Sequence, residues 1–112
     1  MTPRFRIRVA KYIGFFCLLG VLAACATAPP VQEMSDARQA IAAAKEAGAE
    51  ELAQSQLNEA EGLLMTAEKF LKTGTSAAYW QARKSAISAK EVAFEALLAS
   101  RTVRQSESGS IQ

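Results

Sequence analysis

Apolar residues recur through residues 31–100 at alternating spacings of three and four, which places them on one face of an α-helix. The first two stripes consist of Met34, Ala37, Ile41, Ala44 and Gly48, and of Leu57, Ala60, Leu64, Ala67 and Leu71. Trp80, Ile87 and Phe94, at seven-residue steps, are expected to widen a third stripe formed by Tyr79, Ala82, Ala86, Ala89, Ala93 and Ala96. The pattern predicts three amphipathic helices.

Two breaks divide these helices. Residues 31–100 contain no proline, and their alanine and unbranched polar residues are good helix formers. Helices are expected to end near Gly48 and within 72–76, because glycine tolerates the left-handed conformation and Ser or Thr can cap the next helix. The fold class is therefore predicted to be all-α, a small antiparallel three-helix bundle with helices of about 31–48, 53–72 and 76–100.

The predicted core is rich in alanine, which allows close helix contact but buries little area for each residue. A core of this size rarely contributes more than about 3 to 5 kcal/mol of net stability. We therefore expect either a marginally stable monomer or apolar stripes that another copy or another protein completes. Residues 101–112 lose the periodicity and gain Ser, Gly and Gln, which predicts a flexible tail.

The first 24 residues carry a different pattern. Four basic residues, Arg4, Arg6, Arg8 and Lys11, precede an uncharged apolar run over 13–24. A basic start, a short apolar core and small residues before a cleavage point are typical of a secretory signal peptide. The alternative, a permanent transmembrane helix, would need roughly 20 apolar residues.

The end of this leader, Leu22, Ala23, Ala24 and Cys25, resembles the lipobox of bacterial lipoproteins. The resemblance implies that the thiol of Cys25 receives diacylglycerol, that the chain is cut before Cys25, and that acyl chains hold the protein on a membrane. Ala26 stands where an aspartate would indicate retention in the inner membrane, so the resemblance implies the periplasmic face of the outer membrane. The alternative is an ordinary signal peptide with an incidental cysteine.

The predicted mature chain starts with a tether. Residues 25–30 end in two prolines and have too little apolar bulk to pack, which favours a short, extended spacer. From Cys25 onward, nine Lys and Arg stand against eleven Asp and Glu, a formal charge of −2. This balance gives no basic surface for nucleic acid.

The segments 34–49, 57–64 and 86–93 resemble the helical lipoprotein family called domain of unknown function 4398. The resemblance runs over about 31–100, and it implies a small helical lipoprotein of the proteobacterial envelope. Some members are fused to a peptidoglycan-binding domain of the outer-membrane-protein-A type. No such domain follows in this sequence, so peptidoglycan binding is not implied for it.

Candidate chemistry is sparse. The chain has no histidine and no metal-binding, phosphate-binding or nucleophile motif, so we predict neither an enzyme nor a cofactor. Tyr79 and Trp80 are the candidate contact with a protein partner, because aromatic residues are enriched at binding hot spots. The alternative is that both plug one end of the bundle. The sequence predicts a non-enzymatic interaction or scaffold module, with a small-ligand or lipid carrier as the alternative.

Overall fold

The protein is all-helical over the residues that the structure, a computed structural model, describes. These are residues 3–111, except that the side chains of 3, 5 and 19–27 are left undescribed. In chain order the helices are α1 (Pro3–Thr27), α2 (Val31–Glu46), α3 (Ala49–Leu52), α4 (Gln54–Thr73) and α5 (Ser76–Ser110). This confirms the predicted all-α class.

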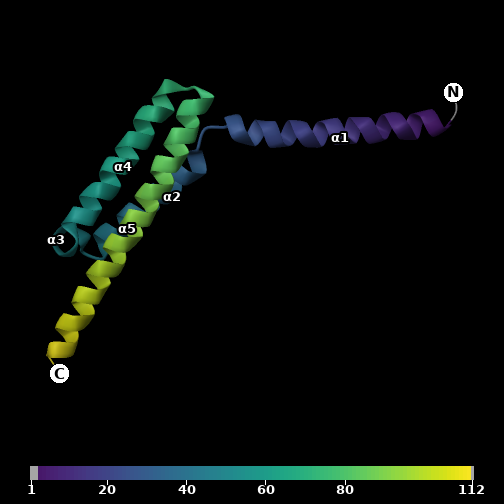
Figure 1. Ribbon diagram of the computed structural model, residues 1–112. Helices are drawn as coiled ribbons and strands as arrows, with labels where there is room; N and C mark the ends of the chain where they lie inside the picture. The colour runs from purple at the N-terminus through teal and green to yellow at the C-terminus, as the bar shows by residue number, and fades with distance from the viewer. Residues whose placement is uncertain (1–2, 112) are drawn as a thin grey trace.

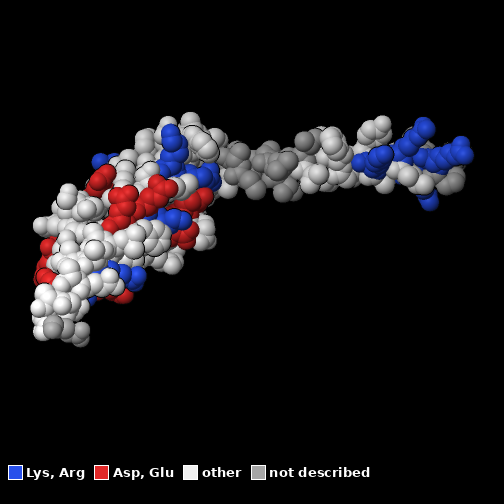
Figure 2. Space-filling model, turned by 60° about the horizontal axis from the view of Figure 1, so that its bottom comes forward, with Lys and Arg blue, Asp and Glu red and all other residues white. Residues whose placement is uncertain are grey.

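The molecule is extended rather than compact, with principal dimensions of 85 × 36 × 14 Å. Figure 1 shows α1 projecting from a body in which α2, α4 and α5 lie along one another. The basic side chains of α1 gather at its end far from the body, whereas acidic and basic residues intermingle on the body itself (Figure 2). The leader and the helical domain expected from the sequence are therefore different in both shape and charge pattern.

Ion pairs define the relative direction of α2 and α4. Arg38 of α2 donates to Glu68 of α4 over 3.0 Å, and Lys45, two turns later in α2, pairs with Glu61, two turns earlier in α4. The residue numbers rise along one helix and fall along the other, so the two helices run in opposite directions. Helix α5 packs against both of them.

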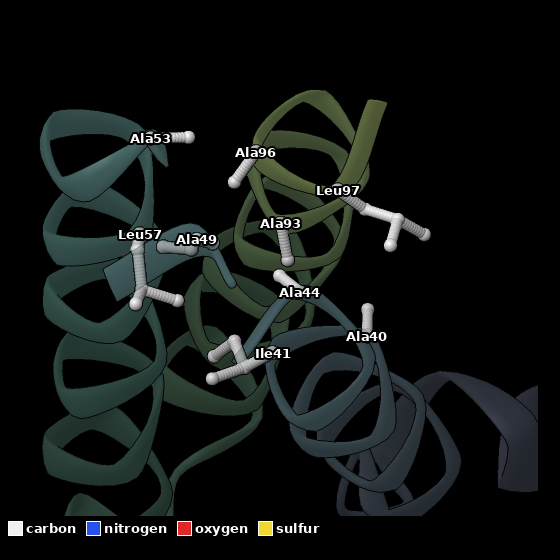
Figure 3. Close-up of a cluster of buried hydrophobic side chains, with 10 residues drawn as sticks. Ala40, Ile41, Ala44, Ala49, Ala53, Leu57, Ala93, Ala96 and Leu97 are labelled. Carbon is white, nitrogen blue, oxygen red and sulfur yellow. The ribbon is translucent and has the colours of Figure 1, made fainter. Parts of the chain in front are cut away.

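The core of the body is built mainly from alanine. Figure 3 shows side chains of α2, α3, α4 and α5 meeting in one cluster, which consists of Ala40, Ile41, Ala44, Ala49, Ala53, Leu57, Ala60, Ala93, Ala96 and Leu97. A smaller cluster joins Met34, Ala67 and Ala86. Few large side chains are buried, so the helices approach closely and each residue buries little apolar area.

Glycine closes two of the helices, as the sequence predicts. Gly48, after α2, has φ of +90°, and Gly74, after α4, has φ of +74°. The hydroxyl oxygen of Thr75 then accepts a hydrogen bond of 3.1 Å from the backbone nitrogen of Ala78 and caps α5. The predicted start of the second helix near residue 53 agrees with α4, but the single turn of α3 before it was not predicted; Ala53, with φ of −148° and ψ of 44°, separates the two.

Helix α5 is longer than the sequence pattern predicts, because it continues to Ser110 instead of ending near Ser100. Hydroxyl groups in the extension are satisfied within the helix: Thr102 donates to the carbonyl of Leu98, and Ser106 donates to that of Val103. The side chains beyond Ser100 are mostly exposed. The apolar periodicity therefore ends where α5 leaves the packed core, and the helix itself continues to Ser110.

Gly48 is the first position at which this fold can be tested. A Cβ at Gly48 would lie 2.7 Å from the Nη2 atom of Arg104, and its φ is one that L-residues rarely adopt. We expect Gly48→Ala to lower the free energy of unfolding by about 1–2 kcal/mol. Thermal unfolding followed by circular dichroism measures this loss.

Gly62 provides the matched control for Gly48→Ala. It lies inside α4 with no atom within 4 Å of the position of an added Cβ. Gly62→Ala should stabilise the protein by about 0.5–1 kcal/mol, because alanine is the better helix former. Equal stability of the two variants would contradict the strained turn at Gly48.

Candidate interaction surface

The predicted lipobox lies at the end of α1. The backbone of Leu22, Ala23, Ala24 and Cys25 belongs to that helix, but their side chains lie outside the described residues. Acylation of Cys25 therefore stays a prediction. Cys17, on an exposed part of α1, is the free cysteine of the described part. Among the described residues, no helix is both long enough and hydrophobic enough to cross a bilayer.

The predicted tether is in contact with the body. Helix α1 extends through Thr27, and Pro30, at the start of α2, is buried. The guanidinium of Arg83 in α5 donates to the carbonyl of Ala28 over 3.3 Å and to the carboxylate of Glu33 over 2.9 Å. One side chain of α5 thus fixes the place where the chain joins the helical body.

A row of large apolar side chains is exposed along α5. It consists of Trp80, Ile87, Phe94 and Leu98, and we call it the α5 seam. Their exposed fractions run from 39% for Ile87 to 61% for Leu98. Exposed apolar side chains that line up along one helix mark an interaction site more often than scattered ones do.

The expectation that Trp80, Ile87 and Phe94 widen the buried stripe of α5 is therefore wrong. Alanines at 82, 86, 89, 93 and 96 are fully buried and form the centre of the contact. An α-helix turns by about 100° for each residue, so a residue next to a central alanine points away from the contact. Because the alanines bring the helices close together, the aromatic side chains of α5 lie outside the centre of the contact.

Phe94 places the α5 seam beside α2. It lines a surface cleft of about 360 Å³ together with Lys90 of the same helix and Asp36, Gln39, Ala40 and Ala43 of α2. At Phe94 the seam therefore borders the contact between α2 and α5. An occupant of this surface would meet apolar side chains from α5 and polar side chains from α2.

Tyr79 and Trp80, the aromatic pair singled out in the sequence, have different surroundings. Tyr79 is half-buried, and its hydroxyl oxygen lies 3.9 Å from the position that a Cβ on Gly74 would take. Trp80 is exposed and belongs to the α5 seam. Sequence reasoning did not select Leu98 for this surface, although its position four residues after Phe94 is a signal that could have done so.

A second cleft, of about 430 Å³, lies between α2 and α4. Its apolar wall consists of Ile41, Ala42, Leu64 and Met65, and the ion pairs of Arg38 and Lys45 stand at its sides. The hydrogen bond to Glu61, together with the charge of that carboxylate, raises the pKa of Lys45. Both pairs are largely exposed to water, so each adds little stability.

The described residues hold no group of three or more His, Cys, Asp or Glu side chains that could bind a metal ion. No protein-family model, curated protein or solved structure matches the chain. The features of the chain that bear on function are therefore its leader sequence and the surfaces of α2, α4 and α5.

Arg83 tests how the chain is joined to the body. Its ion pair with Glu33 is mostly buried, with exposed side-chain fractions of 19% and 29%. We expect Arg83→Gln to lower the free energy of unfolding by about 1 kcal/mol. Arg38→Gln is the control, because its pair with Glu68 is 54% and 43% exposed, and its loss should cost about 0.3 kcal/mol. Denaturant titrations that rank the two variants the other way would refute this role for Arg83.

Proposed function

We propose that this protein is a lipoprotein of the bacterial envelope, anchored through Cys25 on the periplasmic face of the outer membrane. Its residues 31–100 form an antiparallel three-helix bundle that acts as a non-enzymatic interaction or scaffold module. The observation that supports this function best is the α5 seam, where four large apolar side chains remain in water while alanines occupy the core. The family called domain of unknown function 4398 is the proposed relative.

The exposure of the α5 seam favours a role in binding a partner over a role in stabilising the fold. Leaving Trp80 and Phe94 partly in water forgoes hydrophobic stabilisation in a protein whose core has little to spare. A partner that covers these side chains would regain that free energy on association. Aromatic residues at the centre of a contact are also the ones that contribute most to binding.

The leader supports the anchor. Basic residues at one end of α1 and an apolar run before Cys25 are the features that export and lipid attachment require. Each buried methylene of an acyl chain contributes about 0.8 kcal/mol, so two or three chains hold a protein firmly. The connection from Ala28 to Arg83 then keeps the helical body close to the anchor.

The second candidate function is a carrier of a small apolar ligand or lipid. The cleft between α2 and α4 favours it, because Ile41, Leu64 and Met65 give it an apolar wall of ligand-like size. The alanine-lined interfaces of the core argue against it, because close packing of the helices leaves little room for a ligand between them.

Cys25→Ser tests the anchor. In cells fed a labelled fatty acid, we expect the unchanged protein to carry label, and Cys25→Ser to abolish the label because the acceptor thiol is gone. Cys17→Ser is the matched control, since Cys17 is the other cysteine of the chain and should leave labelling unchanged. Label that persists in Cys25→Ser would overturn the anchor.

Photo-crosslinking amino acids placed at two exposed apolar positions separate the two functions. We expect a crosslinker at Leu98, in the α5 seam, to form protein adducts in intact cells. A crosslinker at Met65, which is similarly exposed but lies on α4, should form none. Lipid adducts at Met65 without protein adducts at Leu98 would favour the carrier and refute the interaction module.

A further inference from the structure

We propose that the partner of the α5 seam is a second copy of this chain, whose α5 lies antiparallel to the first with Trp80 of each copy opposite Leu98 of the other. This inference rests on the proposed function as an interaction module and names its partner. Three features of the seam support it: the spacing of its residues, their exposed apolar area and the positions of the charged residues among them.

The seam is part of a longer exposed line with the period of a coiled coil. Lys84 and Glu91 complete it, so that its members alternate between spacings of four and three: Trp80, Lys84, Ile87, Glu91, Phe94 and Leu98. All six side chains are exposed. A mean spacing of 3.5 residues keeps such a line straight along the contact of two helices.

The apolar area of this line is enough for a small dimer. Its two aromatic and two aliphatic side chains together expose on the order of 400 Å² in each copy. Pairing would bury roughly twice that area, and the stems of the lysine and glutamate side chains would bring the contact to about 1,000 Å², near the lower limit of specific interfaces.

The charges determine the direction of the pairing. In a parallel pair, Lys84 would face Lys84 and Glu91 would face Glu91, and like charges across an interface destabilise it. In the antiparallel pair, each Glu91 faces Ile87 of the second copy instead of another carboxylate. Each Lys84 faces Phe94, over which its ammonium group can make a cation–π contact. Glu95 of the second copy then lies within one residue of the level of Lys84, where the two charges attract.

The same charges favour a protein over a membrane as the occupant. Glu91 and Glu95 stand beside the apolar residues of the seam, and carboxylates at the surface oppose contact with anionic lipid. The rest of the chain leaves the seam accessible, since α1 projects away from the length of α5 (Figure 1).

Disulfide trapping in the full-length, membrane-bound protein tests the pairing. Two differently tagged copies are co-expressed in a Cys17→Ser background, one with Trp80→Cys and the other with Leu98→Cys. We expect mild oxidation to give at least ten times more dimer from the mixture than from either variant alone. In the proposed register, identical positions lie about 27 Å apart and cannot be bridged. Each variant keeps three of the four apolar residues of the seam.

Two further variants test whether the seam itself holds the dimer. Phe94→Gln, added to both copies, should reduce the crosslinked dimer at least fivefold, whereas Met65→Gln, on the exposed face of α4, should leave it unchanged. Circular dichroism of both variants checks that the helices remain formed. The Cys17→Ser parent, with no added cysteine, measures the background amount of dimer that forms through Cys25.

The possible failures are distinguishable. Dimer from either single-cysteine variant alone would mean a parallel pair and would overturn the antiparallel arrangement. Absence of all dimer, together with adducts between Leu98 and a different protein, would overturn self-pairing and leave the proposed function standing. Absence of both the crosslinked dimer and the Leu98 adducts would overturn self-pairing and the proposed interaction function together.

Discussion

The contact of α5 with α2 and α4 through alanine is the constraint on which the rest of this structure depends. Ala82, Ala86, Ala89, Ala93 and Ala96 have no exposed surface, and such small side chains allow the helix backbones to approach closely. Close approach leaves no space for an aromatic ring at the centre of the contact. Ile87 and Phe94, each next to one of these alanines, therefore lie outside it, and the body gains an apolar outer surface because of how its inner one is packed.

Much of the fold could be predicted from the sequence because it is determined by local chemistry. Gly48 and Gly74 adopt the left-handed conformation that ends a helix, and Thr75 caps the helix that follows. The single turn of α3 and the extension of α5 to Ser110 were not predicted. Residues 49–52 carry no sequence signal that distinguishes one helical turn from a connection, and a polar sequence with internally bonded hydroxyls can continue a helix beyond the packed core.

The candidate surface was predictable by residue type but not by orientation. Periodicity places Trp80, Ile87 and Phe94 on one line, yet it does not say whether that line or the neighbouring alanine line is buried. Size decides this, since two lines about 140° apart around the helix cannot both lie at the centre of its contacts, and the smaller residues permit the closer contact. Leu98, four residues after Phe94, belongs to the same surface, and the observed exposure of all four side chains joins it to the others.

The proposed antiparallel pairing and the proposed anchor at Cys25 together constrain how the dimer would lie on a membrane. The chain enters the body beside Arg83, because that side chain binds both Ala28 and Glu33. With Trp80 opposite Leu98, the two Arg83 side chains lie about 18 Å apart along the helix axes, on either side of the centre of the pair. Both of the proposed anchors can then reach one membrane only if the pair lies along its surface. The short segment from Cys25 to Pro30 favours the same orientation in the proposed lipoprotein, since it would leave the body little room to stand away from the lipid.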